Sequence, residues 1–202
     1  VLDSLDTADF RLYPDPASSA LVRSLADYYG VDEDQVFVGV GSDDVLSLCF
    51  LTFFNSEKPI LFPDITYSFY KVWAELYRIP YECPALDGDF RIVKEDYYRE
   101  NGGIIFPNPN APTAIYEELD FVEDILEHNR DSIVIVDEAY VDFAGRSAME
   151  LIGKYDNLIV TQTFSKARSL AGMRIGYAIS NPDLIRCLND VKYSFNSYTM
   201  SS

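Results

Sequence analysis

The hydrophobic positions of this 202-residue chain follow two alternating patterns. Short runs rich in Val, Ile and Phe predict strands that are buried on both faces, because neither side of such a run is polar. The runs cover residues 36–40, 59–62, 103–106, 132–136, 158–161 and 175–179. Between several of them, apolar residues recur every three or four positions, which is typical of helices. The pattern predicts an α/β fold, a three-layer α/β/α sandwich around a mostly parallel sheet.

Helical spacing covers four stretches: 18–30, 45–54, 67–76 and the acidic segment 117–129. The first stretch begins with Ser18 and Ser19, which can cap a helix, and Gly30 is placed to end it. We find no internal repeat and no long Gly/Ser linker in the sequence. One large domain or a tight pair of domains is therefore expected, in keeping with ordinary domain lengths.

The net charge and the hydropathy of the chain limit the kinds of partner that it can have. The chain has 16 basic and 33 acidic residues and a formal net charge of −17. Because nucleic-acid backbones attract Lys and Arg, this charge argues against nucleic acid as a partner. The longest apolar stretch, near residues 45–54, is too short to cross a bilayer, and no basic segment followed by an apolar run opens the chain. We expect neither a membrane partner nor a signal peptide.

The cysteines and the single histidine suggest little chemistry. Cys49, Cys83 and Cys187 have no paired spacing, which favours free, buried thiols in a reducing, cytoplasmic setting. Without a CxxC pair, no metal site is expected. His128 lies in the acidic helix, where we expect a solvated side chain rather than a member of a Ser-His-Asp triad.

Polar residues follow several predicted strands, at the sheet edge where ligands bind in open α/β folds. Gly41, Ser42 and Asp43 follow one strand and begin a helix, whose amino end could bind a phosphate. Alternatively, Ser42 or Asp43 is only a helix cap. Asp137 follows another strand, and a carboxylate there needs a cationic partner such as a protonated pyridine nitrogen, unless it too is a cap.

Further candidates follow the strand at residues 158–161. Lys166 could become a Schiff-base nucleophile in a polar pocket, although most lysines are simply solvated, and Arg174 could bind a phosphate. Asn110 lies in a proline-restricted loop, where its side chain could be a rigidly held hydrogen-bond donor or part of an ordinary turn. The ring of Tyr67 could stack on a planar ligand or belong to the core. Together these residues describe a planar ligand with a phosphate, a basic ring nitrogen and an aldehyde. Pyridoxal phosphate has all of these groups.

The motifs also resemble a known family in their order along the chain. They are residues 11–16 (RLYPDP), 41–43 (GSD), 63–70 (PDITYSFY), 108–113 (NPNAPT), 137–143 (DEAYVDF), 165–166 (SK) and 170–177 (LAGMRIGY). This set is similar to the large domain of histidinol-phosphate aminotransferases, which are fold-type I enzymes dependent on pyridoxal phosphate. The resemblance covers nearly the whole chain.

The resemblance implies catalytic roles for three residues. Lys166 would bind pyridoxal phosphate as a Schiff base and then move a proton during amino transfer. Asp137 would pair with the pyridinium nitrogen and keep it protonated, because a nearby negative charge favours the charged form. Tyr140 would hydrogen-bond the ring hydroxyl, and Tyr67 would stack on the ring. The family commonly has Asn directly before the second proline of its asparagine loop; here that residue is Ala111, so the asparagine role is carried to Asn110.

The resemblance also implies a phosphate site and a homodimer. Tyr13 would reach the cofactor phosphate of the neighbouring subunit. The residues implied around the phosphate within one subunit are Ser42, Asp43, Thr163, Ser165 and Arg174. The family usually has glycine where this chain has Ala114, and Ala114 would strain the turn if the turn needs a positive φ.

The reaction implied is amino transfer between small amino and keto substrates: L-histidinol phosphate and 2-oxoglutarate give imidazole acetol phosphate and glutamate, in histidine biosynthesis. Residues 1–202 would form the cofactor-binding large domain, while the family's amino-terminal substrate segment and small carboxy-terminal domain lie outside them. The alternatives are a threonine-phosphate decarboxylase, an aromatic aminotransferase, or a truncated, non-catalytic module for cofactor binding or dimerisation.

Overall fold

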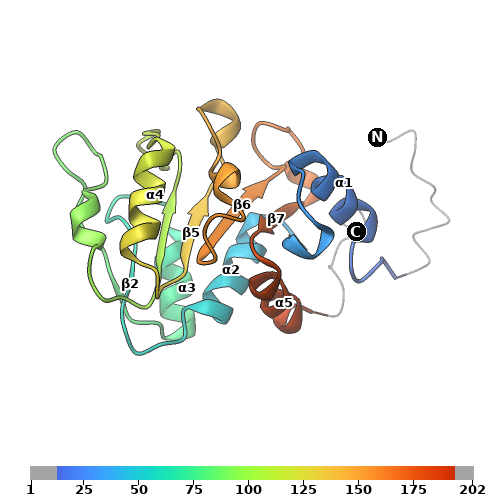
Figure 1. The fold of residues 1–202 in the computed structure, drawn as a ribbon, viewed down its shortest axis with the longest axis horizontal. Coiled ribbons are helices and arrows are strands. Elements are labelled where there is room, and N and C mark those ends of the chain that lie inside the picture. Colours follow the sequence, from blue (N-terminus) through green and yellow to red (C-terminus); the bar gives the residue numbers. More distant parts are fainter. Residues whose placement is uncertain (1–12, 194–202) are drawn as a thin grey trace.

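Residues 13–193 are described by the computed structural model, which contains a central sheet between two layers of helices (Figure 1). The strand order is β1-β7-β6-β5-β4-β2-β3. Strand β7 runs antiparallel to β1 and β6, and the other neighbouring pairs are parallel. The predicted three-layer α/β fold with a mostly parallel sheet is confirmed. The strands are β1 Val36–Gly39, β2 Ile60–Leu61, β3 Tyr81–Glu82, β4 Ile104–Pro107, β5 Val134–Asp137, β6 Leu158–Thr163 and β7 Gly176–Ile179.

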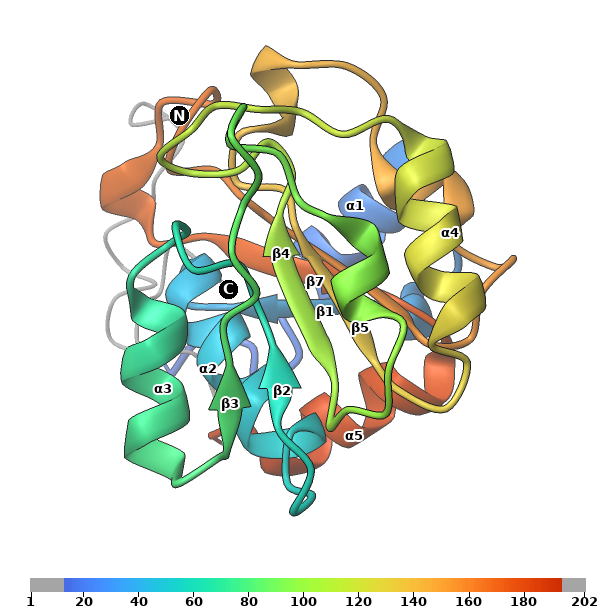
Figure 2. The ribbon, with the colours of Figure 1, turned by 90° about the vertical axis from the view of Figure 1, so that its left-hand side faces the viewer.

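The two faces of the sheet pack against different helices (Figure 2). Ile135 and Ile159 belong to the core formed with α2, α3 and α5, whereas Val134 and Val136 pack with α4. Helix α1 covers β1 and β7 on the α4 side. The α-helices are α1 Ser19–Tyr29, α2 Ser42–Phe53, α3 Phe69–Tyr77, α4 Leu119–His128 and α5 Pro182–Val191. Short 3-10 helices are η3 Glu33–Gln35, η4 Lys94–Tyr97, η5 Val141–Phe143, η6 Ala148–Leu151 and η7 Ala171–Met173.

Helix ends agree with the sequence prediction at some positions and differ at others. Gly30 ends α1 with a φ of +67°, as predicted. At the start of α1, the backbone amides of Ala17 and Ser19 donate to the carboxylate of Asp15, which the prediction had not considered. Strand β3 and helix α5 were missed. The start of α5 had a sequence signal, because Asn181 caps the helix and Pro182 occupies its first turn.

The surroundings of the cysteines and of His128 also differ partly from expectation. Cys49 is buried and Cys187 is half-buried, but Cys83 is exposed, so the expectation of three buried thiols was wrong for Cys83. His128 is the last residue of α4, and its ring stacks on Tyr98 with the centroids 3.8 Å apart. Within residues 13–193, no helix is both long and apolar enough to cross a membrane.

The strand ends carrying the candidate residues meet at one edge of the sheet. Register pairs Pro107 at the end of β4 with Asp137 at the end of β5, and Asp137 in turn with Thr161 of β6. At the same edge, Gly176 begins β7 beside Thr163, the last residue of β6. Segments from very different parts of the sequence therefore converge here, as expected for the ligand edge of an open α/β sheet.

Candidate active site

A pocket of about 230 Å³ opens at this edge of the sheet. Eight of the residues that sequence reasoning selected line it, together with five that it did not select. The eight are Ser42, Asp43, Tyr67, Asp137, Tyr140, Ser165, Lys166 and Arg174, and the five are Leu46, Pro107, Ala111, Ala139 and Ala171. The pocket therefore brings together a carboxylate at the end of β5 with an amine and a guanidinium from the connection between β6 and β7.

Asp137 ends strand β5 and is only 4% exposed. Burial raises the pKa of Asp137 to about 6, because the charged form loses its hydration. Two donors partly oppose this effect: the Tyr70 hydroxyl lies 2.8 Å from Oδ2, and the backbone amide of Ala139 lies 3.2 Å from Oδ1. Among the described residues, no backbone amide in the first turn of a helix donates to Asp137, so its placement differs from the alternative interpretation as a helix cap.

Arg174 lies against the start of helix α2. A Cβ built on Gly41, which has a φ of +87° and precedes α2, would lie only 2.4 Å from Nη2 of Arg174. The guanidinium also donates to the carbonyl oxygen of Ala171 at 3.2 Å. The backbone amides of the first turn of α2 and a guanidinium thus occupy one corner of the pocket, which is a favourable arrangement for a phosphate.

Lys166 lies in the segment that follows β6, and its Nζ is 5.2 Å from the ring centroid of Tyr140. The base of this segment is fixed by Thr163, which is buried and does not line the pocket. The Thr163 hydroxyl lies 3.1 Å from Oγ of Ser165 and accepts from the Ser165 backbone amide at 3.2 Å. Thr163 therefore shapes the turn that presents Ser165 and Lys166.

Tyr67 and Asp43 form one wall of the pocket. The Tyr67 hydroxyl donates to Oδ1 of Asp43 at 2.8 Å. Burial and the Asp43 carboxylate both raise the pKa of Tyr67 above its ordinary value, so the phenol stays neutral. This hydrogen bond fixes the ring of Tyr67 beside the first turn of α2.

Asn110 and Tyr13 are not brought to the pocket lining. The Asn110 side-chain amide donates to Oγ1 of Thr113 at 3.1 Å, within its own loop, and to the carbonyl oxygen of Ile65 at 3.0 Å, which ties the loop to the connection between β2 and α3. Ala111 lines the pocket instead. Tyr13 is 82% exposed. Arg11 and Leu12, which precede it in the same motif, lie outside the described residues.

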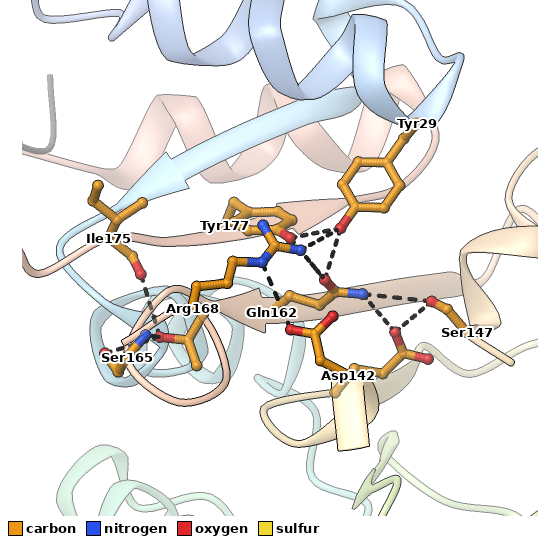
Figure 3. Close-up of polar contacts among 10 residues, drawn as sticks. Tyr29, Asp142, Ser147, Gln162, Ser165, Arg168, Ile175 and Tyr177 are labelled. Carbon is orange, nitrogen blue, oxygen red and sulfur yellow. Dashed lines mark hydrogen bonds and ion pairs between the residues drawn. The ribbon is translucent and has the colours of Figure 1, made fainter. Parts of the chain in front are cut away.

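Sequence reasoning missed Tyr70 and a group of polar side chains behind the pocket (Figure 3). The group is centred on Gln162, whose Nε2 donates to Glu138 at 2.8 Å. Glu138 lies in the motif at residues 137–143, for which the sequence predicts roles only at Asp137 and Tyr140. A buried acid directly after Asp137 was the available signal, since a buried carboxylate requires donors.

The sequence of residues 2–202 matches the family model described as aminotransferase class I and II. The chain belongs to this family. The predicted resemblance is therefore confirmed at the level of the aminotransferase family. Across residues 13–193, no group of three or more His, Cys, Asp or Glu is placed to hold a metal ion.

Among similar aminotransferases, the histidinol-phosphate aminotransferase of Pseudomonas putida (strain W619) is 56% identical over 192 residues, covering 95% of this chain and 55% of the relative. That of Lactococcus lactis subsp. cremoris (strain SK11) is 52% identical over 202 residues, covering 100% of this chain and 57% of the relative. The chain thus spans a little over half the length of these relatives.

Solved structures of more distant proteins share the fold. Histidinol-phosphate aminotransferase from Sinorhizobium meliloti, in complex with pyridoxal-5'-phosphate, has a TM-score of 0.88 at 23% identity and covers 96% of this chain and 55% of its own. L-threonine-O-3-phosphate decarboxylase from Porphyromonas gingivalis has a TM-score of 0.81 at 21% identity, with coverages of 95% and 58%. An aminotransferase and a decarboxylase share this architecture, so the fold alone does not choose between them.

Proposed function

We propose that the pocket binds pyridoxal phosphate and that residues 1–202 form the cofactor-binding large domain of a histidinol-phosphate aminotransferase. The observation that carries this proposal is that Lys166, Asp137 and Arg174 line one pocket. Their amine, carboxylate and guanidinium match the aldehyde, the ring nitrogen and the phosphate of the cofactor. Sequence identity of 52–56% to histidinol-phosphate aminotransferases supports this member of the family.

The electrostatics of Asp137 fit a cationic ring nitrogen. A carboxyl group whose pKa is raised to about 6 by burial lacks full compensation for its charge. A pyridinium nitrogen beside it would supply the opposite charge and lower that pKa, because opposite charges favour each other's ionised forms. By the same interaction, Asp137 would keep the nitrogen protonated, which is the form of the ring that best accepts electrons.

The groups near the start of α2 fit an anion. The backbone amides of Ser42 and Asp43, the Arg174 guanidinium and the Ser165 hydroxyl would hold the phosphate, and Thr163 would hold the turn that presents Ser165. Local groups are needed because the chain as a whole carries a charge of −17. Salt screens that distant charge over about 8–10 Å, whereas direct contacts are screened much less.

The remaining pocket residues would orient the reacting groups. Pyridoxal phosphate supplies an aldehyde for attachment and a ring that acts as an electron sink. Lys166 would form the covalent link and then hold or deliver the proton that moves during amino transfer. Tyr140 would donate to the ring hydroxyl, while Tyr67, fixed by Asp43, would face the ring. Asn110 would act indirectly by fixing the loop that places Ala111 at the pocket.

A homodimer is part of the proposal, with Tyr13 reaching the phosphate of the neighbouring subunit. Its exposed side chain supports that role. Helix α3 also exposes Phe69, Val72 and Leu76, which are spaced to lie along one side of the helix and form an apolar surface suited to a partner. Analytical ultracentrifugation would test this part: a dimer is expected, and a monomer at all concentrations would exclude shared sites.

A cytoplasmic location is also proposed. Cys49, Cys83 and Cys187 are free thiols, which is typical of proteins in reducing compartments. Fractionation of cells that produce the protein tests this, with recovery outside the cytoplasm as the contrary result.

The reaction is tested by supplying L-histidinol phosphate and 2-oxoglutarate to the protein with pyridoxal phosphate. Glutamate and imidazole acetol phosphate are expected in equal amounts, because the amino group moves from one carbon skeleton to the other without net oxidation. Lys166→Ala should abolish the reaction. Cofactor binding without glutamate formation would favour the non-catalytic module, and failure of the protein to bind the cofactor would overturn the proposal.

Two other enzymes are tested in the same assay. An aromatic aminotransferase would form glutamate faster from phenylalanine than from L-histidinol phosphate. A threonine-phosphate decarboxylase would instead release carbon dioxide from O-phospho-L-threonine, without any need for 2-oxoglutarate. Preference for either substrate would replace L-histidinol phosphate in the proposal while leaving the cofactor site unchanged.

A further inference from the structure

Figure 3 shows a polar network around Gln162. This network lies on the opposite face of the sheet from Asp137 and Thr161. Because side chains alternate along strands, Asp137 and Thr161 point to the α2 side, whereas Glu138 and Gln162 point to the α1 side. Gln162 is 3% exposed and lies between a carboxylate and two phenols. Its Nε2 donates to Glu138, and its Oε1 accepts from Tyr177 at 2.7 Å.

Arg168 connects this network to the segment that carries Lys166. Its Nη2 donates to the Tyr29 hydroxyl at 3.1 Å and approaches Oε1 of Gln162 at 3.4 Å. Its Nε lies 3.6 Å from Oδ2 of Asp142, two residues after Tyr140. The Arg168 guanidinium therefore contacts helix α1, strand β6 and the segment after Tyr140. Because Arg168 lies two residues after Lys166, these contacts connect all three elements to the segment that carries Lys166.

Charge makes this connection stronger than a set of neutral contacts. The side-chain amide of Gln162 contacts Glu138 through its nitrogen and Arg168 through its carbonyl oxygen. Opposite charges therefore polarise the two ends of one amide, which strengthens both hydrogen bonds. Glu138 also accepts from the Ser147 hydroxyl at 2.5 Å and from the Ala148 backbone amide at 2.6 Å. These donors stabilise a carboxylate that would otherwise be costly to bury.

The segment after β6 needs such an anchor because its backbone is strained. Ser169 has a φ of +55° and Arg174 a φ of +53°, both in the left-handed region that residues other than glycine rarely adopt. Each such residue costs about 1–2 kcal/mol, so the conformation persists only where surrounding contacts impose it. The ring of Phe164, with its centroid 4.8 Å from Cζ of Arg168, adds a contact from the start of the segment.

We propose that Arg168 is a positioning residue for Lys166: from the far face of the sheet, it fixes the segment at residues 164–174 and the Tyr140–Asp142 segment in the relative placement that cofactor binding requires. This inference rests on the proposed function for its consequence at the cofactor. Its structural part, the anchoring of residues 164–174, is measurable without the cofactor.

Hydrogen exchange on the cofactor-free protein tests the anchoring. Arg168→Met keeps the length of the side chain and removes the guanidinium. The matched control is Arg130→Met, because Arg130 also pairs with a carboxylate, that of Glu127, and lies over a ring, that of Tyr155, but at the amino end of β5. We expect exchange in peptides covering residues 164–174 to be about tenfold faster in Arg168→Met and unchanged in Arg130→Met. Unchanged exchange in Arg168→Met would overturn the inference, whether or not the protein binds pyridoxal phosphate.

Titration with pyridoxal phosphate then tests the consequence for Lys166. Arg168→Met should raise the dissociation constant at least tenfold and reduce the visible circular dichroism of the bound cofactor, which reports its orientation. Arg168→Lys, which keeps the positive charge, should restore part of the affinity and part of the circular dichroism. If Arg168 acted only by packing, restoring the charge would restore neither. If Arg168→Met does not fold, Tyr29→Phe, which removes one partner of the guanidinium, should show the same changes at smaller size. Wild-type affinity and circular dichroism in the variant that folds would overturn the inference; a wild type without affinity would overturn the proposed function instead.

Discussion

The hydroxyl of Tyr70 donates to Oδ2 of Asp137 at 2.8 Å, and both side chains are buried. Tyr70 lies in the first turn of α3, whereas Asp137 ends β5, so this bond joins a covering helix to the edge of the sheet. It orients the carboxyl group and partly offsets the rise of its pKa caused by burial. Tyr70 therefore stabilises the carboxylate form of Asp137 in an apolar surrounding.

Tyr70→Phe should destabilise the cofactor-free protein at pH 7 by about 1–3 kcal/mol, because it leaves a buried ionised carboxylate short of a donor. Tyr97→Phe is the matched control. Tyr97 is also buried, but its hydroxyl has no hydrogen-bond partner among the described residues, so its removal should be neutral or stabilising. Urea unfolding of both variants measures the difference. Equal losses of stability would contradict the importance of the Tyr70–Asp137 bond.

The pKa of Asp137 predicts how stability depends on pH. Because the folded-state pKa of about 6 lies above the ordinary value of 3.8, the folded protein holds an extra proton between these values, and stability falls as pH rises through that window. The loss from Asp137 is at most about 3 kcal/mol. Glu138, whose pKa burial raises to about 7, adds a loss in the same direction.

Asp137→Asn should remove the Asp137 part of this dependence, so the cofactor-free variant should exceed the wild type in stability at pH 7. Urea unfolding between pH 4 and pH 8 measures it. Pyridoxal phosphate should reduce the loss in the wild type, because a cationic ring nitrogen compensates the carboxylate. A stability that rises from pH 4 to pH 7 equally in both proteins would contradict the burial of an uncompensated acid.

Site residues could be predicted from the sequence where a reactive side chain follows soon after a predicted strand. Asp137 and Lys166 were predictable because each follows an apolar run, and the carboxyl ends of parallel strands meet at one edge. Tyr70 was not, since its partner is distant in sequence and its spacing suits a core residue equally well. The direction of β7 also depends on pairing across the sheet, which local patterns do not encode.

Gly41→Ala tests the corner that would hold the phosphate. The added methyl group would displace the Arg174 guanidinium, so affinity for pyridoxal phosphate should fall at least tenfold. Gly30→Ala is the control, because Gly30 has a similar positive φ but nothing within 4 Å of the added Cβ. Gly30→Ala should lose about 1–2 kcal/mol of stability, because Gly30 is in the left-handed region. Gly41→Ala should lose more, because its φ of +87° and ψ of 163° lie in a region that is essentially confined to glycine, and only Gly41→Ala should lose affinity. Equal affinities in fluorescence titrations would remove Arg174 from the phosphate site.

Ala114→Gly should stabilise the protein. Ala114 has a φ of +60°, so the turn does need the left-handed conformation, as the sequence comparison with the family's glycine had suggested. Relief of that strain outweighs the greater freedom of glycine in the unfolded chain, and we expect a gain of about 0.5–1 kcal/mol. Ala20→Gly, at an exposed position in the first turn of helix α1, should instead cost stability, by less than the roughly 1 kcal/mol that glycine costs in a helix interior. Thermal unfolding distinguishes the two signs, and a loss in Ala114→Gly would show that the turn is not strained.

Attachment of pyridoxal phosphate to Lys166 can be measured by reduction with borohydride followed by peptide mass spectrometry. Reduction converts the link between the lysine nitrogen and the cofactor carbon to a stable secondary amine. We predict one cofactor per chain, on the peptide that contains Lys166, and none on that peptide in Lys166→Ala. Labelling of an exposed lysine such as Lys58 or Lys71 in place of Lys166 would show that Lys166 does not hold the cofactor.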